Sequence, residues 1–436
     1  MSSVRVRCCG ARASSTLATL LSVAIFAAMP WLTGCAQRAD ASRTVVVDTA
    51  GGVVHVHNPA RGSVWRLRLL ATVADLADST AILRAGAVTA DSAGRIYVAD
   101  ARAGLVRVFD STGHLVRTIG RRGTGDGEFR RPLGLGWLGD TLVVLDGSNA
   151  RLALVSRDGA WLGAWPHGYV GNTPAIISTG DERELYARVE GAASAVAGAW
   201  YRRVTPAGPT NDTLHLPRGA ESPAASVVCL GGTGIMTFDI PSAPQWAYTF
   251  AHGGYTVASP DNRYHITFID QRGDTVRTVD RPAAEIEAGS DVWQHAADAL
   301  AQYERAHPGA RCTPPRMPRV RTERILGDLF TDADGRLWVE RRATAAERAT
   351  LGGADSAQQD AGGGTPNGED APASDSTLSR VAVLDVLDGE GKLLGTMPAP
   401  VRELSVLPYA SGDRLYVVAR VGGRDVVRVY RIERGT

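Results

Sequence analysis

The chain has 436 residues, of which 44% are hydrophobic and 21% charged, so it can bury a core of ordinary size. Its 49 glycines and 22 prolines favour many short strands joined by tight turns. The 47 basic and 46 acidic side chains nearly cancel, so the net charge gives no electrostatic footprint for nucleic acid.

The first 34 residues have the layout of a secretory signal. Arg5, Arg7 and Arg12 form a positive start, and Leu17–Met29 is a compact apolar stretch. A plain transmembrane anchor is the alternative, because the uncharged stretch is long enough to span a bilayer. We therefore expect residues 1–34 to direct export.

The signal ends in Leu32-Thr33-Gly34-Cys35, which resembles the bacterial lipobox. The resemblance implies that cleavage occurs before Cys35 and that the Cys35 thiol carries a lipid. Multiple acyl chains would hold the protein stably on a membrane. Ala36 and Gln37 follow instead of an Asp, which favours the outer over the inner membrane.

Residues 35–62 are expected to be a tether with one strand. His55 and His57 alternate on that strand and therefore point to the same face, where they could share a metal. Nothing else supplies a third ligand at a suitable spacing, so we expect solvated imidazoles, no metal and no cofactor.

A turn followed by an alternating apolar strand recurs six times from residue 63 onward. Period-2 alternation bounded by Gly and Asp turns is typical of antiparallel strands. The six copies are Gly94–Asp100, Gly139–Asp146, Glu184–Val189, Gly253–Val257, Gly335–Val339 and Asp413–Val417. A second β-rich run follows each copy: Leu105–Asp110, Arg151–Ser156, Trp200–Thr205, Tyr264–Asp270, Val381–Asp385 and Val426–Arg431. Four strands per unit at roughly 40-residue spacing predict an all-β fold, a six-bladed β-propeller over residues 63–436.

Closure of the ring can also be predicted. The sixth unit ends soon after its third strand, and Trp65–Ala71 is a strand-like run with no partner nearby. Pairing Trp65–Ala71 with Val426–Arg431 would complete the sixth blade and remove an open edge.

The stretch Gly94–Pro132 resembles an NHL-type repeat, with GRIYVAD, then RVFDSTG, then an Arg-rich strand ending in GRRGTGDGEF and Pro132. More broadly, the layout is similar to six-bladed propeller lipoproteins of several bacterial phyla. The resemblance implies the fold rather than an activity.

Two segments do not fit a blade. Residues 289–310 contain a predicted helix, Ser290–Ala306, with Ser290 as its N-cap and an apolar face that includes Trp293 and Tyr303. We expect this face to pack on the propeller between the fourth and fifth blades; the alternative is a ligand or partner surface. Residues 343–378 have too few apolar side chains to fold and are expected to be a disordered insertion between two strands of the fifth blade.

Cys229 and Cys312 are the two cysteines left after the signal and the lipid site. In an exported chain they are candidates for a disulfide. The alternative is two small buried hydrophobic residues, since the sequence does not give their geometry.

Local catalytic motifs are few. Gly120–Gly127 lacks the Lys-Ser/Thr of a phosphate loop and is interpreted as a turn between blades. Asp332 and Asp334 begin like a calcium loop, but Ala343 stands where the Glu should be, so a hairpin turn is predicted. There is no GxSxG or HExxH motif.

We therefore expect a binding or scaffolding module for a protein, peptide or glycan, anchored to the cell envelope by lipid. Aromatic residues of the irregular blades are candidate contacts, although packing between blades explains them equally: Trp161, Trp165, Trp200, Tyr201 and Trp246. The alternative is a metal-dependent hydrolase or lactonase, which would need several carboxylate, Asn or His side chains on the innermost strands.

Overall fold

The computed structural model divides into two compact units, residues 1–40 and Ala41–Thr436, and only the second contains residues that the structure describes. Residues 1–34 and Cys35 thus lie outside the described part. No helix within that part is long and apolar enough to cross a membrane. The described residues are 44–73, 81–167, 176–178, 182–189, 200–215, 226–231, 234–243, 247–251, 253–260, 263–344, 347, 382–402 and 406–435.

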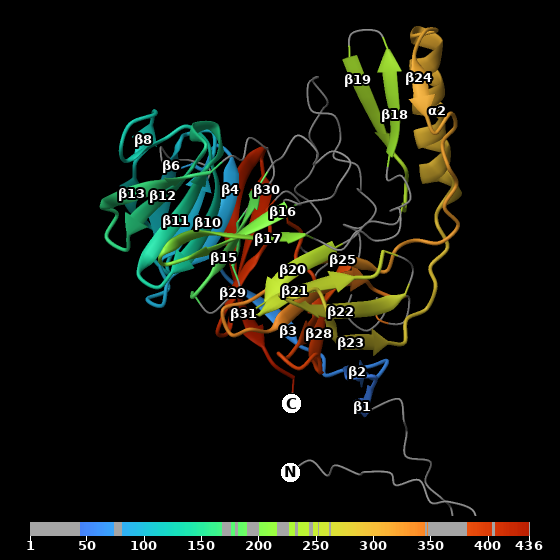
Figure 1. The fold of residues 1–436 in the computed structure, drawn as a ribbon, viewed down its shortest axis with the longest axis horizontal. Coiled ribbons are helices and arrows are strands. Elements are labelled where there is room, and N and C mark those ends of the chain that lie inside the picture. The colour runs from blue at the N-terminus through green and yellow to red at the C-terminus, as the bar shows by residue number, and fades with distance from the viewer. Residues whose placement is uncertain are drawn as a thin grey trace, which may run out of the picture. The chain divides into compact units, whose positions relative to one another are not determined.

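The described strands form successive antiparallel sheets of four strands, joined in chain order (Figure 1). The first sheet is β4 (Ala85–Ala90), β5 (Ile96–Asp100), β6 (Leu105–Phe109) and β7 (Leu115–Ile119). The second is β10 (Pro132–Leu138), β11 (Thr141–Asp146), β12 (Arg151–Ser156) and β13 (Trp161–Pro166). The third is β14 (Ile176–Ser178), β15 (Leu185–Val189), β16 (Trp200–Thr205) and β17 (Gly208–His215).

The fourth sheet contains β20 (Ala247–Ala251), β21 (Gly254–Ala258), β22 (Tyr264–Asp270) and β23 (Thr275–Arg281). The fifth is β25 (Leu326–Thr331), β26 (Leu337–Arg342), β27 (Ala382–Leu387) and β28 (Leu393–Pro398). The sixth is β29 (Tyr409–Ser411), β30 (Arg414–Val421), β31 (Arg424–Glu433) and β3 (Arg66–Val73). Each predicted turn-and-strand copy becomes the second strand of one of these sheets.

The core lies between the sheets rather than inside any one of them. Every residue of β5 is buried, on both faces of the strand, because neighbouring sheets cover both. Separate apolar clusters join each sheet to the next, and a further cluster, which includes Val88 and Val418, joins the sixth sheet to the first. Sheets that stack in succession and return to the first are the arrangement of a β-propeller.

The predicted closure is confirmed. β3 pairs antiparallel with β31, from Arg66 opposite Glu433 to Val73 opposite Val427, with a bulge between Leu69 and Ala71. The sixth sheet therefore combines three strands from the C-terminal region, β29–β31, with β3 from the N-terminal region. β3 covers β31, which is not left as an open edge.

An added hairpin was not predicted. β1 (Val46–Ala50) pairs with β2 (Val53–His57), and β2 runs parallel to β23, which widens the fourth sheet to six strands. The chain then crosses to the fifth sheet, where the buried Asn58 donates to the Gly391 carbonyl and accepts from the Leu393 amide, both at 2.8 Å.

A separate three-stranded sheet lies outside the blades. It consists of β19 (Gly234–Asp239), β18 (Ser226–Gly231) and β24 (Arg311–Thr313), and we call it, together with helix α2 (Ser290–Ala306), the satellite module. Its sheet joins segments that precede (β18 and β19) and follow (β24) the strands β20–β23 of the fourth sheet in the sequence. Cys229 and Cys312 are opposite each other on β18 and β24 and form a disulfide.

The helix bounds agree with the sequence analysis, but its packing partner and its cap do not. The apolar face of α2, which includes Trp293, Leu300 and Tyr303, packs on the satellite sheet (Figure 1), so the expectation that it packs on the propeller blades is wrong. The reason is that β18 and β19 supply a nearer apolar face. Gly289, not Ser290, is the N-cap residue.

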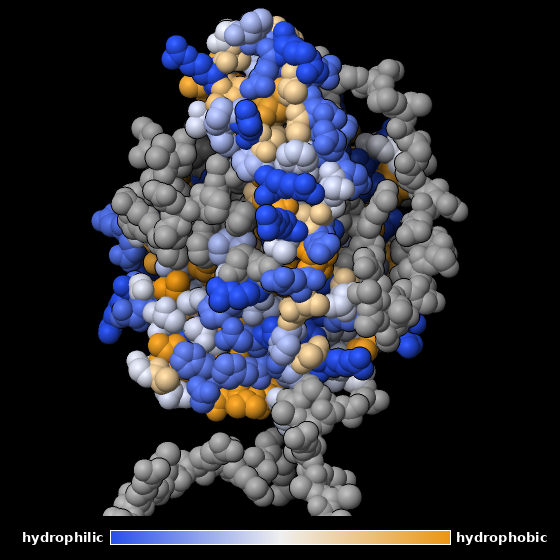
Figure 2. Space-filling view, turned by 90° about the vertical axis from the view of Figure 1, so that its right-hand side faces the viewer, coloured by the Kyte–Doolittle hydropathy of each residue, from blue (hydrophilic) through white to orange (hydrophobic). Residues whose placement is uncertain are grey.

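Figure 2 shows apolar side chains between hydrophilic ones on the side of the molecule that carries α2.

The predicted insertion lies, as expected, between β26 and β27. Most of residues 343–378 fall outside the described part, but its first residues contradict the expectation of disorder. Ala343 is buried, and the carboxylate of Glu347 accepts hydrogen bonds from Arg341. These few residues are held because they lie against a buried ion network that the composition of the segment does not reveal.

Candidate functional site

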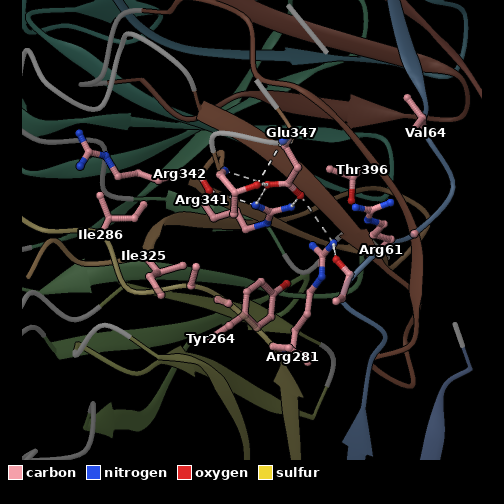
Figure 3. Close-up of a pocket in the computed structure, with 16 residues that line it drawn as sticks. Arg61, Val64, Tyr264, Arg281, Ile286, Ile325, Arg341, Arg342, Glu347 and Thr396 are labelled. Atoms are coloured by element: carbon pink, nitrogen blue, oxygen red, sulfur yellow. Dashed lines mark hydrogen bonds and ion pairs between the residues drawn. The ribbon is translucent and has the colours of Figure 1, made fainter. Parts of the chain in front are cut away.

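A pocket of about 650 Å³ lies between the fourth and fifth sheets, at the end where β22 begins and β23 and β26 finish (Figure 3). The chain between β2 and β3 forms one wall, through residues 60–64. The residues after β23 form another. We call this cavity the interblade pocket. Its volume is in the range of sites for small ligands or for a few residues of a longer one.

The floor of the pocket is a buried ion network centred on Asp385. One Asp385 oxygen accepts from Arg341 Nε at 2.7 Å and from Arg281 Nη1, and the other accepts from the Thr396 hydroxyl at 2.7 Å. All three charged side chains are buried. Buried charges are tolerated when each is paired and hydrogen-bonded in this way.

A second carboxylate completes the network. Glu347 accepts from both terminal nitrogens of Arg341, at 2.8 and 2.5 Å, in a bidentate pair. Arg281 also donates to the carbonyls of Pro59 and Ala60, at 3.2 and 2.9 Å. The network thus fixes the wall formed by residues 59–64 to the fourth and fifth sheets.

The network holds its charges rather than exchanging protons. Burial raises the pKa of Asp385, but the guanidinium groups of Arg341 and Arg281 outweigh it, and the pKa lies below its ordinary value. Burial lowers the pKa of Arg341, yet Asp385 and Glu347 bring it above its usual range. The pKa of Tyr264 is raised first by burial and then by the charge of Asp385. A general acid or base needs a pKa near neutrality, and these shifts lead away from it.

The surface that a ligand would meet is part apolar and part cationic. Val64, Ile286 and Ile325 line the pocket, and Arg61 is an exposed cation at its wall (Figure 3). The guanidinium of Arg61 suits a carboxylate, phosphate or sulfate group. The arrangement can therefore bind a partly apolar group that carries a negative charge.

The two histidines of β2, weighed above as a metal pair and expected not to bind one, contact different side chains. Nδ1 of His55 lies 2.8 Å from the Thr278 hydroxyl, and Nε2 of His57 lies 3.6 Å from the Asp48 carboxylate. Within the described ranges, no group of three or more His, Cys, Asp or Glu side chains could hold a metal ion.

The hydrolase alternative needs metal ligands on the innermost strand of each blade sheet. These strands are β4, β10, β14, β20, β25 and β29, the first of the four blade strands in each sheet. Asp328 on β25 is the sole acidic residue of the described innermost strands, which contain no His, and its carboxylate pairs with Arg402. These strands do not provide the several ligands that the metal-dependent alternative needs.

Three of the candidate aromatic contacts are placed, and they pack between sheets. Trp161 packs on the cluster shared by the first and second sheets, and Arg151 lies 5.1 Å from its ring centre. Trp165 packs between the second and third sheets, and the buried Tyr201 packs against Phe250 with tilted rings whose centres are 4.8 Å apart. The side chain of Trp200 and all of Trp246 lie outside the described residues.

The aromatic residues of the helix are also engaged within the fold. Trp293 Nε1 donates to the Pro318 carbonyl at 3.0 Å, and Tyr303 packs edge-on against Phe238 with ring centres 5.4 Å apart. Both side chains therefore hold the satellite module together, and neither points to a ligand.

The two motif-like loops are turns, as predicted. Asp332 accepts from the amides of Asp334 and Arg336, at 2.9 and 2.8 Å, which closes a hairpin turn between β25 and β26. The loop Gly120–Gly127 follows β7 and contains the two-residue strand β8 (Arg121–Arg122), which pairs with β9 (Glu128–Phe129) just before β10. Glu128, directly after this loop, accepts from the Gly125 amide at 2.9 Å and from Arg121 at 2.8 Å.

The residues that build the interblade pocket were not identified from the sequence. Three ionisable residues of the network lie at or near the end of a predicted strand: Arg281, Arg341 and Asp385. At such a position an ionisable residue usually indicates the start of a turn, so burial was not expected. The usable signal is that Asp385 continues the apolar alternation of its strand, at a position where burial is expected.

Comparison with known proteins finds no matching family model and no matching curated protein. Solved structures similar to this chain include a member of the DUF4221 family from Bacteroides vulgatus, at 10% identity and a TM-score of 0.44, covering 86% of this chain and 100% of that one. Virginiamycin B lyase from Staphylococcus aureus is similar at 10% identity and a TM-score of 0.36, covering 84% of this chain and 99% of its own. Regucalcin from Agrobacterium tumefaciens, a calcium-binding protein, is similar at 10% identity and a TM-score of 0.36, with 85% and 97% covered. At this identity the similarity concerns the fold alone.

Proposed function

We propose that this chain is an exported, lipid-anchored propeller of six blades that binds a protein, peptide or glycan in its interblade pocket. One observation supports it above others: a concave site with an apolar wall and an exposed cation, Arg61, rests on a network of paired buried charges. A floor fixed in this way offers a preformed surface, and a preformed site loses less entropy on binding.

The ion network also favours binding over catalysis. Asp385 and Arg341 are each saturated by their partners, and their pKa values are shifted away from neutrality. The ligand class that fits carries a carboxylate, phosphate or sulfate beside an apolar group, which an acidic peptide segment or an acidic glycan provides.

Binding to arrays of acidic peptides and glycans tests the proposal, with each hit measured in solution by calorimetry. Arg61→Ala should weaken a true ligand about tenfold, the loss expected for one charge-assisted contact of roughly 1.4 kcal/mol. Arg66→Ala, which removes an exposed arginine outside the pocket, is the matched control and should change affinity less than twofold.

A ligand that binds the parent and the Arg61→Ala variant with the same affinity would show that its binding site is not the interblade pocket. Hydrolysis of lactones or esters that requires a divalent metal and stops with a chelator would overturn the binding role and support the hydrolase alternative.

A further inference from the structure

A second pocket, of about 710 Å³, is lined by six arginines and lies where the sixth, first and second sheets meet. We propose that this arginine pocket binds a ligand that carries two or more phosphate groups. The six arginines are Arg84, Arg102, Arg122, Arg130, Arg131 and Arg420. No acidic side chain is among the described residues that line it.

Such a concentration of one charge is local, because the whole chain is close to neutral, with 47 basic and 46 acidic residues. Positive charges that converge on one cavity repel one another, and a bound anion relieves that repulsion. Most of these arginines, including Arg84, Arg102 and Arg130, are exposed, so their guanidinium groups are accessible. The site is a strong exception to the charge balance of the rest of the surface.

Buried carboxylates fix the backbone that carries these arginines. Asp100, at the end of β5, accepts from the amides of Leu83 and Arg84 at 3.0 and 3.2 Å. Asp146, at the end of β11, accepts in the same way from the amides of Arg130 and Arg131 at 3.1 and 2.8 Å. The first and second sheets therefore present their arginines by the same device, with the carboxylate engaged below the pocket.

The sixth sheet adds the third side in a related way. Asp425 is buried and accepts from the Ala85 amide at 2.8 Å and from Arg420 Nε at 3.1 Å. Arg122, from the glycine-rich loop, donates to the Arg102 carbonyl at 2.6 Å, which orients one guanidinium over another stretch of the rim. Positions held by three sheets and one loop give a preorganised site rather than a chance cluster.

The chemistry favours phosphate. A planar guanidinium donates in a fork that matches two oxygens of a phosphate, and several such forks in one cavity suit a ligand with several phosphates. The volume suits a small molecule or a headgroup rather than a nucleic-acid duplex. The phosphates could belong to a soluble polyphosphorylated molecule or to the headgroup of an anionic lipid, and the experiment separates the two.

The test uses the full chain purified in detergent micelles, with inorganic tripolyphosphate as the probe and calorimetry at low and at high salt. We expect saturable binding that weakens with salt. The double variant Arg84→Ala with Arg130→Ala should weaken it at least tenfold. It keeps the backbone amides that Asp100 and Asp146 bind, so its melting temperature should stay within about 2 °C of the parent.

The matched control is Arg66→Ala with Arg272→Ala, which removes the same charge from exposed positions outside the pocket and should change affinity less than twofold. Arg84→Lys with Arg130→Lys keeps the charge but not the fork, and should bind with intermediate affinity. Arg61→Ala should have no effect, because that residue belongs to the interblade pocket.

Competition then identifies the source of the phosphates. Micelles doped with cardiolipin, which has two phosphates, displace tripolyphosphate if a lipid headgroup fits, whereas micelles doped with phosphatidylcholine serve as the neutral control. Displacement by cardiolipin alone indicates a headgroup, and no displacement indicates a soluble ligand; both support the site. Absence of saturable tripolyphosphate binding, or equal weakening in the Arg66/Arg272 control, overturns the proposal.

Discussion

Replacing Asp385 with Asn tests whether the buried ion network stabilises the propeller as described. The change keeps the side-chain shape and removes the fully buried anion that both Arg281 and Arg341 contact, while Glu347, 3.9 Å from Arg281, remains. Breaking a buried pair from one side typically costs about 3–5 kcal/mol, because a charge is left without compensation. Arg341 keeps Glu347 and Arg281 keeps two carbonyl acceptors, so we expect the lower figure, about 3 kcal/mol.

The expected change in melting temperature is small despite this cost. The unit Ala41–Thr436 has 396 residues, and an unfolding entropy of about 2.1 cal/mol/K per residue gives about 0.8 kcal/mol per degree. A loss of 3 kcal/mol then lowers the melting temperature by about 4 °C if the unit unfolds in one step. Denaturant unfolding measures the free energy directly and is the preferred assay.

The pH dependence gives the network a signature of its own. The folded-state pKa of Asp385 lies below its ordinary value near 3.8, so its carboxylate contributes stability above that pH and loses it as the pH falls through the folded-state pKa. The free-energy difference between the parent and Asp385→Asn should be constant from about pH 5 to 8 and shrink below about pH 4.

The exposed Asp126 supplies the control, since Asp126→Asn removes a charge of the same kind from the surface and should cost less than about 0.5 kcal/mol. A loss below 1 kcal/mol for Asp385→Asn, or a difference that does not change between pH 7 and pH 3, would show that the network contributes little.

Four further outcomes are expected. Truncation after Gly422 removes β31 and should destabilise the whole propeller, seen as loss of the cooperative unfolding transition; a transition that keeps its midpoint would contradict the closure. Cys229→Ser with Cys312→Ser should raise amide exchange in the satellite module but leave exchange in the blade sheets unchanged, because the disulfide lies within that module alone. Burial lowers the pKa of His167, so the folded protein binds fewer protons and its stability should fall as the pH drops below about 6.5; His167→Gln should reduce that slope, and an unchanged slope would assign it to other groups. Cys35→Ser should release the protein from membranes or leave it as an uncleaved precursor, and unchanged processing would overturn the lipid anchor.

Strands that repeat could be predicted from the sequence because their signals are local. β12, β16 and β22 have the predicted bounds, since each is an alternating apolar run closed by Gly or Asp turns. β3 could be placed only by counting: it has no repeat signal of its own, but the last unit lacked a strand. Such predictions depend on the alternation of apolar residues along each strand and on the number of strands in each repeat unit, and they need no knowledge of contacts between residues.

The satellite module could not be predicted in the same way. β18 pairs with β24 although strands β20–β23 of the fourth sheet lie between them in the sequence, and neither β18 nor β24 belongs to a repeat. The hairpin β1–β2 is likewise short and aperiodic. Both pockets escape sequence analysis for a related reason, because each brings together strand ends from different sheets. The doublets Arg121-Arg122, within the glycine-rich loop, and Arg130-Arg131, shortly after it, are the one local signal that could have indicated the arginine pocket.

The pairing of β3 with β31 also sets the order of events during biogenesis. β3 leaves the ribosome, and any export channel, long before its partner, so it stays unsatisfied while the intervening blades assemble. During that interval its free hydrogen-bonding groups are available to the β31 of another molecule. An exchange of this strand would give dimers linked through the sixth sheet, and dilute or slow refolding should suppress them.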